Sequence, residues 1–212
     1  MKKRIALGLA LALLAGLLSG CGETAPIQGE PVSRKPVVYL YPEEETQVIV
    51  NLDFDGVLTS TYPAYGDGWT VTARPDGTLT DENGREYYCL FWEGVSQREY
   101  DFSAGFCVAG ADTAAFLEDA LAQLGLTRRE ANEFLIYWLP RMEGNPYNLI
   151  SFQGATYTDG ARLDIDPAPD TLIRVFMAWK RLDRPEQIAP QELKAVERTG
   201  FTVVEWGGTE VN

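Results

Sequence analysis

The chain has 212 residues, of which 18 are Lys or Arg, 31 are Asp or Glu and none is His, giving a formal net charge of −13. Such an acidic surface repels phosphate backbones, which argues against nucleic acid as a partner. The lack of His excludes a Ser-His-Asp triad, a Cys-His pair and any His-ligated metal or haem site within the chain. Acid–base chemistry would depend on Asp, Glu, Tyr, Lys or Cys, and no cofactor is predicted.

The first 21 residues have the pattern of an export signal. Lys2, Lys3 and Arg4 are positive, residues 5–18 are apolar, and the segment ends in Leu18-Ser19-Gly20-Cys21. The apolar run is shorter than the ~20 residues of a membrane-spanning helix, which favours a signal peptide. Its ending resembles the lipobox of bacterial lipoproteins. That resemblance implies that Cys21 carries diacylglycerol, with fatty acids such as palmitate, and becomes the new N-terminus.

Three segments are therefore expected. Residues 1–20 are a lipoprotein signal peptide, residues 21–35 contain the lipidated Cys21 and a flexible tether, and residues 36–212 form a single domain. The lipid anchors the chain in the cell envelope, on the extracytoplasmic side of a bacterial membrane. A plain secretory signal followed by an unmodified cysteine is the alternative.

Short β-like runs make residues 36–109 rich in strand. Thr46–Phe54 alternates apolar and polar residues, with Val48, Val50 and Leu52 on one face, and Asp55-Gly56 is a dipeptide typical of a hairpin turn. The other expected strands of this half are 37–41, 57–61, 69–73, 86–92 and 100–109. We expect an antiparallel meander.

The second half mixes helices and strands. Thr127 and Glu130 have the spacing of a capping box for a short helix. The apolar run 134–139, followed by Pro140, predicts a strand paired with 147–152. The other expected elements are a helix from Asp112 to Gly125, strands at 161–165 and 172–179, a helix between Pro190 and Gly200, and a strand at 201–206. The predicted class is α+β, with an antiparallel β-rich first half.

Four runs together resemble an uncharacterised family of bacterial secreted proteins and lipoproteins. They are Lys35-Pro36-Val37-Val38-Tyr39-Leu40-Tyr41-Pro42, Phe91-Trp92-Glu93-Gly94, Tyr137-Trp138-Leu139-Pro140 and Val203-Val204-Glu205-Trp206-Gly207-Gly208. The resemblance spans nearly all of the chain after the signal peptide. It implies no activity and therefore transfers no catalytic residues.

Two acidic pairs have the spacing of reactive or metal-binding carboxylates. The run around Asp53 and Asp55 resembles the first motif of haloacid-dehalogenase-type phosphatases, which implies Asp53 as nucleophile, Asp55 as acid/base and Mg²⁺ between them. The strand that returns directly after the motif favours a hairpin turn instead. Asp164 and Asp166 share a strand face and could hold one Ca²⁺, or simply be solvated.

The tryptophans offer a different interpretation. All five lie in apolar strand-like runs, so most are expected in the core: Trp69, Trp92, Trp138, Trp179 and Trp206. Glu93 follows Trp92, and Glu205 precedes Trp206, which makes these four residues candidate contacts for a carbohydrate or peptide ligand. We therefore expect a membrane-anchored binding or envelope-interaction module. The alternative is a carboxylate-based hydrolase, either a glycosidase or an Asp53-dependent phosphatase.

Cys89 and Cys107 lie at equal distances from a polar loop around Arg98. If the flanking runs pair as a hairpin, the two cysteines lie opposite each other and can form a disulfide. An exported protein meets oxidising conditions, which permits that bond. Two buried free thiols are the alternative.

Overall fold

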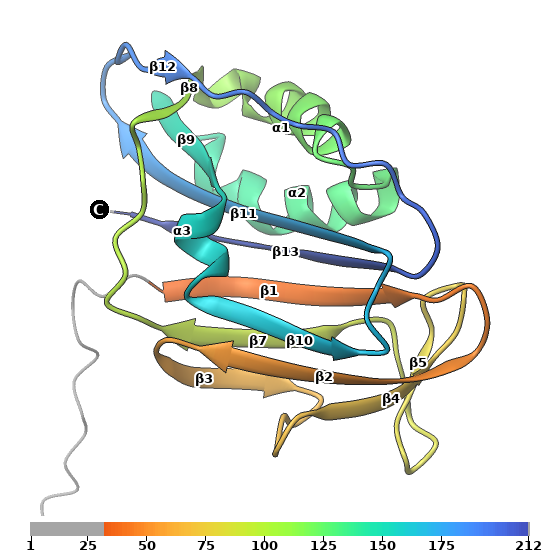
Figure 1. The fold of residues 1–212 in the computed structure, drawn as a ribbon. Helices are drawn as coiled ribbons and strands as arrows, with labels where there is room; N and C mark the ends of the chain where they lie inside the picture. The colour runs from red at the N-terminus through yellow and green to blue at the C-terminus, as the bar shows by residue number, and fades with distance from the viewer. Residues whose placement is uncertain (1–31, 212) are drawn as a thin grey trace, which may run out of the picture.

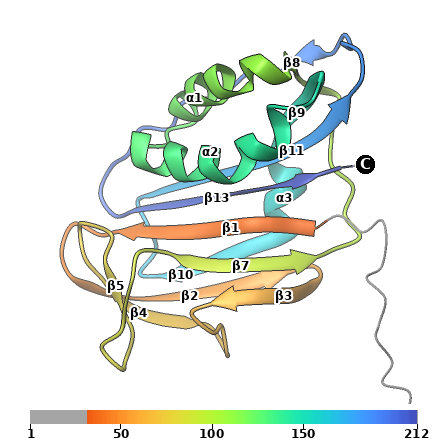
Figure 2. The same cartoon turned by 180° about the vertical axis from the view of Figure 1, so that it is seen from behind.

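A computed structural model describes residues 32–211. Cys21, the predicted signal peptide and most of the predicted tether lie outside this range. The described chain has three layers (Figures 1 and 2). Helices α1 (Thr113–Gln123) and α2 (Arg128–Met142) cover one face of an eight-stranded sheet, and a five-stranded sheet packs on the other face.

The larger sheet joins the first strand of the described chain to the last. Its order is β12 (Ala189–Pro190), β8 (Ala104–Ala109), β9 (Tyr147–Gln153), β11 (Thr171–Leu182), β13 (Thr202–Glu210), β1 (Val32–Tyr41), β7 (Leu90–Val95) and β3 (Val57–Tyr62). Strands β11 and β13 are parallel, as are β12 and β8, and the other pairs are antiparallel. Because β1 includes Val32, the end of the expected tether is part of the sheet.

The smaller sheet is antiparallel throughout. Its order is β10 (Ala161–Asp166), β2 (Thr46–Phe54), β4 (Trp69–Ala73), β5 (Leu79–Thr80) and β6 (Glu86–Tyr87). Val48, Val50 and Leu52 of β2 are buried while their neighbours are more exposed, as the alternating sequence predicts. The predicted α+β class and its antiparallel, β-rich character are confirmed.

Two hydrophobic cores lie on opposite faces of the larger sheet. In β1, Val37 and Tyr39 belong to the core under the helices, whereas Val38 and Leu40 belong to the core between the sheets. The same alternation places Trp206 under the helices and Val203 between the sheets. Strands covered on both faces have no polar side, which is why their sequences are almost continuously apolar.

The expected strand at 134–139 is wrong, because these residues belong to α2. The predicted capping box begins this helix: the Thr127 hydroxyl accepts from the Glu130 N–H, and the Glu130 carboxylate accepts from the Thr127 N–H at 2.7 Å. Pro140 lies in the last turn, near the end of the helix. No helix within residues 32–211 is long and apolar enough to cross a membrane.

The expected meander is also wrong, because its strands divide between the two sheets. Strands β2 and β3 flank Asp55-Gly56, but β2 pairs with β10 and β4, while β3 pairs with β7. The dipeptide therefore carries the chain from one sheet to the other. Gly56 packs under the Val95 carbonyl and the Phe54 ring, where a side chain would collide.

The helix expected between Pro190 and Gly200 does not form. The segment after β12 has no regular secondary structure, and two side chains hold it against the body of the protein. Gln191 exchanges two hydrogen bonds with the backbone of Phe152, and Arg198 donates to the Gly125 carbonyl at 2.8 Å and to the buried Glu130 carboxylate. These tertiary bonds replace the bonds that a helix would have made.

A buried ion pair lies between the sheets. Arg174 of β11 and Glu205 of β13 are register partners, and the Arg174 Nε lies 2.7 Å from Glu205 Oε2, with the side chains 8% and 1% exposed. The Trp92 indole donates to the other carboxylate oxygen at 3.2 Å, and the guanidinium lies 5.0 Å from the centre of the Tyr157 ring. Burial lowers the pKa of Arg174, but Glu205 and Tyr157 together outweigh burial and hold that pKa above its ordinary value.

This pair predicts an asymmetric response to substitution. Arg174→Met should lower the free energy of unfolding by about 3–5 kcal/mol, because it leaves the Glu205 charge buried and uncompensated. The double variant Arg174→Met/Glu205→Leu removes both charges and should be clearly more stable than Arg174→Met alone. Urea unfolding of the unaltered chain, Arg174→Met, Glu205→Leu and the double variant measures this. A double variant as unstable as the sum of the two single variants would contradict the interpretation.

Candidate functional site

A pocket of about 550 Å³ lies beside α2, on the helix-covered face of the larger sheet. We call it the aromatic pocket. It is lined by Lys35, Val37, Tyr62, Glu86, Tyr87, Tyr88, Cys89, Phe91, Glu93 and Tyr137. Its volume is within the usual range for small-ligand sites, and half of its lining residues are aromatic.

The pocket exists because the helices cover only part of the sheet. Strands β7 and β3 extend beyond α2 with no helix over them (Figure 2). Phe91 and Glu93 of β7 point to this open face, since Trp92 between them belongs to the core between the sheets. Tyr137 of α2 forms the opposite wall.

Lys35 occupies an unusual position at one end of the pocket. The register of β1 shifts against both neighbouring strands between Ser33 and Val37, so that the strand bulges. Lys35 has a φ of 50°, a left-handed conformation that is uncommon for a lysine. Its N–H donates to the Glu93 carboxylate at 3.1 Å, and its ammonium lies 5.1 Å from the centre of the Tyr137 ring. Backbone strain of this kind is common at functional sites.

The four runs that carry the family resemblance meet here. The first supplies Lys35, the second Phe91 and Glu93, and the third Tyr137. The fourth supplies Trp206, whose ring lies 5.9 Å from the Lys35 ammonium. Gly208 of the same run packs so closely on Trp138 that a Cβ would lie 2.8 Å from the indole. Only glycine allows β13 and α2 to approach this closely.

Two of the aromatic side chains that line the pocket are strongly exposed. Tyr62 is 60% exposed and Tyr88 is 54% exposed, and within residues 32–211 they are the only strongly exposed aromatic residues. Tyr62 contacts Tyr87 edge to face, with ring centres 5.4 Å apart. An exposed aromatic cluster is costly to leave in water, which marks the surface as a contact site.

The polar groups of the pocket are carboxylates, phenols and one lysine. Glu86 lies 3.6 Å from Arg74, while Lys35 has no carboxylate within ion-pair distance in the described chain. Burial raises the pKa of Tyr137, and the neighbouring Cys89 is the main cause that raises the pKa of Tyr88. Both phenols therefore stay protonated at neutral pH and can donate hydrogen bonds.

The structure separates the four predicted ligand contacts. Glu93 lines the aromatic pocket, whereas Trp92, Trp206 and Glu205 are fully buried. A tryptophan enclosed in a core cannot stack on a ligand, so that part of the prediction is wrong. All five tryptophans are buried, as the core interpretation expected: Trp69, Trp92, Trp138, Trp179 and Trp206. Sequence reasoning missed the tyrosines that line the pocket.

The carboxylates of both acidic pairs are exposed, with Asp53 near the end of β2, Asp55 in the turn after it, and Asp164 and Asp166 on β10. The side chains of Asp53 and Asp55 are 82% and 76% exposed and face Arg162 and Arg98, respectively. Strand β2 has antiparallel neighbours on both sides, so Asp53 does not lie at the carboxyl edge of a parallel sheet and the phosphatase resemblance fails. Asp164 and Asp166 are exposed on β10, and in the described chain no group of three or more acidic or cysteine ligands is placed to hold a metal.

Cys89 and Cys107 are free, and the expected hairpin between them is wrong. Strands β7 and β8 belong to different parts of the larger sheet, with β9, β11, β13 and β1 between them. At ~4.8 Å per strand, the two cysteines are on the order of 20 Å apart, far beyond disulfide reach. Burial, followed by the nearby Glu133, raises the pKa of Cys89 from 9.0 to about 12.

Comparison with known proteins places the chain in an uncharacterised group. It is 40% identical over 98 residues to a Butyrivibrio fibrisolvens protein described as an uncharacterized protein in the bglA 3′ region. The match covers 44% of this chain and 99% of that protein. The chain belongs to the same family. No family model and no solved structure matches it.

The cysteines give a prediction about reactivity. Iodoacetamide should alkylate the half-buried Cys107 in the folded protein, while Cys89 should react only after unfolding, because its thiolate is disfavoured by burial. Since the folded-state pKa of Cys89 is raised, its contribution to stability is complete below pH 9.0 and is lost as the pH rises toward about 12. Peptide mass spectrometry with and without denaturant measures the labelling. A peptide crosslinked between positions 89 and 107 would contradict the structure.

Proposed function

We propose that this chain is a lipid-anchored extracytoplasmic binding protein whose aromatic pocket binds carbohydrate. One observation supports this most directly: the strongly exposed aromatic residues of the described chain, Tyr62 and Tyr88, line the same pocket as two carboxylates. Aromatic rings provide flat apolar faces for sugar rings, and carboxylates and phenols hydrogen-bond to sugar hydroxyls. An apolar peptide would not use so many polar groups.

Binding fits the carboxylates better than hydrolysis. Glu93 accepts a hydrogen bond from the Lys35 backbone, and Glu86 is close to Arg74, so each carboxylate already has a positive or donor partner. Carboxylates held by such partners are placed to accept further hydrogen bonds from sugar hydroxyls. A carboxylate-based glycosidase remains the second candidate because Glu86 and Glu93 share one pocket.

The anchor follows from the N-terminal sequence. Removal of residues 1–20 takes away Lys2, Lys3 and Arg4 and no acid, so the remaining chain is still more acidic. Such a chain is repelled by anionic headgroups, and attachment depends on the lipid at Cys21. Two or more acyl chains, at ~0.8 kcal/mol per buried CH₂, hold a protein stably. A pocket carried at the membrane surface suits an envelope-interaction role.

The binding proposal predicts the effect of removing the exposed rings. A glycan array identifies an oligosaccharide, which calorimetry then titrates into the purified chain. Tyr62→Ala and Tyr88→Ala should each weaken binding about tenfold, which corresponds to about 1.4 kcal/mol of lost stacking. Val57→Ala is the matched control, because Val57 is 69% exposed on the same strand as Tyr62 but lies outside the pocket.

Three outcomes distinguish the candidates. Equal losses in Val57→Ala and Tyr62→Ala would show that the pocket is not the binding site. Release of new reducing ends that disappears in Glu93→Gln would favour the glycosidase. An array without any bound glycan would contradict both.

The anchor has a separate test. Cys21→Ala should abolish incorporation of radiolabelled palmitate and move the protein out of the membrane fraction, because no thiol remains for diacylglycerol. Cys107→Ala is the control and should be labelled as strongly as the unaltered chain. Equal labelling of Cys21→Ala and Cys107→Ala would refute the lipoprotein proposal.

A further inference from the structure

Strand β11 has a free edge over the first part of its length. Thr171–Val175 pair with β13 on one side, but the pairing with β9 begins only at Phe176, opposite Gln153. After Gln153 the chain leaves the sheet and enters α3 (Ala155–Thr158). The described hydrogen bonds connect no residue to the free side of Leu172–Val175.

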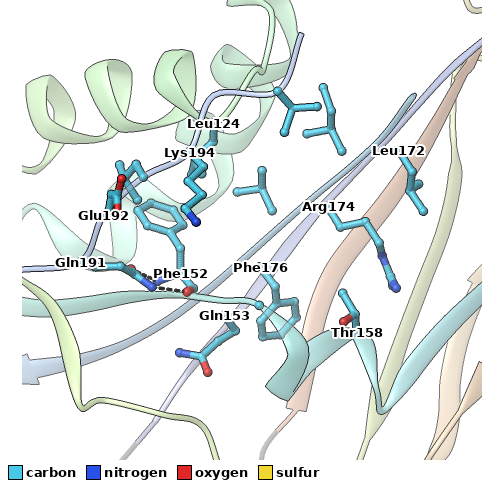
Figure 3. A pocket seen from close by; sticks show the side chains of 15 residues that line it. Leu124, Phe152, Gln153, Thr158, Leu172, Arg174, Phe176, Gln191, Glu192 and Lys194 are labelled. Atoms are coloured by element: carbon cyan, nitrogen blue, oxygen red, sulfur yellow. Dashed lines mark hydrogen bonds between the residues drawn. The ribbon is translucent and has the colours of Figure 1, made fainter. Parts of the chain in front are cut away.

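A pocket of about 610 Å³ lies along this edge (Figure 3). We call it the edge pocket. Side chains from both faces of β11 line it, with Leu172, Arg174 and Phe176 on one face and Ile173 and Val175 on the other. Its outer walls come from the segment 191–196 and from the chain around Gly154.

Glutamine side chains satisfy the backbone N–H and C=O groups of two nearby residues. No side chain does the same for the free edge of β11 in the described chain. Gln191 accepts from the Phe152 N–H at 2.9 Å and donates to its carbonyl, and Gln153 makes the same double contact with Asp101. Each amide thereby imitates a neighbouring strand. The free side of Leu172–Val175 has no such partner in the described chain, although open backbone edges readily pair with added strands.

The charges around the pocket indicate the chemistry of a partner. The Arg174 guanidinium is neutralised by Glu205. Figure 3 shows Lys194 directed toward the middle of the pocket and Glu192 at its rim. Lys194 has no ion pair within residues 32–211, and the exposed Leu172 and Val196 add apolar surface. An occupant therefore needs apolar side chains and an acidic group.

We propose that the free edge of β11 binds an extended peptide by strand addition, with an acidic residue of the peptide facing Lys194. Thr171–Val175 offer ~17 Å of strand, enough for a peptide of about five residues. The walls at 191–196 and Gly154 recess the edge, so that a single strand fits where the edge of a second folded copy does not. Main-chain bonds would supply affinity, and the side-chain positions would supply selectivity.

The test begins with a displayed library of random nine-residue peptides, selected against the whole chain in detergent. We expect enrichment of β-branched residues together with Asp or Glu. The best peptide, once synthesised, should slow amide hydrogen exchange within Leu172–Val175 at least tenfold, which corresponds to about 1.4 kcal/mol of added protection. Lys194→Glu should change the selected charge from acidic to basic.

A wall variant and its control complete the design. Val196→Trp fills the pocket and should weaken the peptide at least tenfold, whereas Ile136→Trp, at a 75% exposed position on α2, should bind as the unaltered chain does. Failure to enrich any peptide would overturn the proposal. Amide exchange within Leu172–Val175 that is unchanged by the peptide would also overturn it, as would peptide binding by Val196→Trp as tight as by the unaltered chain. Protection that results from dimerisation of the chain would overturn it as well.

Discussion

The buried ion pair between Arg174 and Glu205 constrains the register of β11 and β13 in the larger sheet. Both groups lie in a layer that is otherwise aromatic and aliphatic, and they are register partners on the two adjacent parallel strands of the larger sheet. A displacement of one strand by a single residue would turn one charge toward the helices and leave the other unpaired. The pair therefore fixes register more than it adds stability. Trp92 and Tyr157 extend this constraint to β7 and α3.

With the register fixed, the layers cover the sheet unequally. The helices pack on β8, β9, β11, β13 and β1, while the smaller sheet covers β13, β1 and β7 and reaches Phe176 of β11. This offset leaves the helix-side face of β7 and β3 uncovered, and that face becomes the aromatic pocket. The free edge of β11 has a different origin, because β9 ends at Gln153 and leaves the first residues of β11 unpaired on that side.

Local signals in the sequence were sufficient for the class and for several elements. The alternation at Val48, Val50 and Leu52 predicted the buried face of β2, and the Thr127–Glu130 spacing predicted the start of α2. The run 134–139 was assigned wrongly because a short, uniformly apolar run has no decisive period. Tertiary bonds of Gln191 and Arg198 overrode the Pro190 and Gly200 signals, and such bonds have no local signature.

The candidate site was less predictable than the fold. Glu93 was identified because it follows a tryptophan, yet the tryptophan itself is buried and the tyrosines provide the exposed surface. Lys35 and the residues that surround it come from four distant runs, and only the packing of β13 against α2 and β1 brings them together. A single sequence indicates which residues are neighbours along one strand or helix. It does not indicate which residues of different layers come into contact, so this grouping could not be predicted.

The position of β13 has a consequence for the order of assembly. This last described strand lies between β11 and β1, near the middle of the larger sheet. The two halves of the sheet cannot join until Thr202–Glu210 is available, so nearly the whole chain must be synthesised before the central contacts form. A polypeptide that closes its sheet so late keeps its two half-sheets unjoined until synthesis is nearly finished.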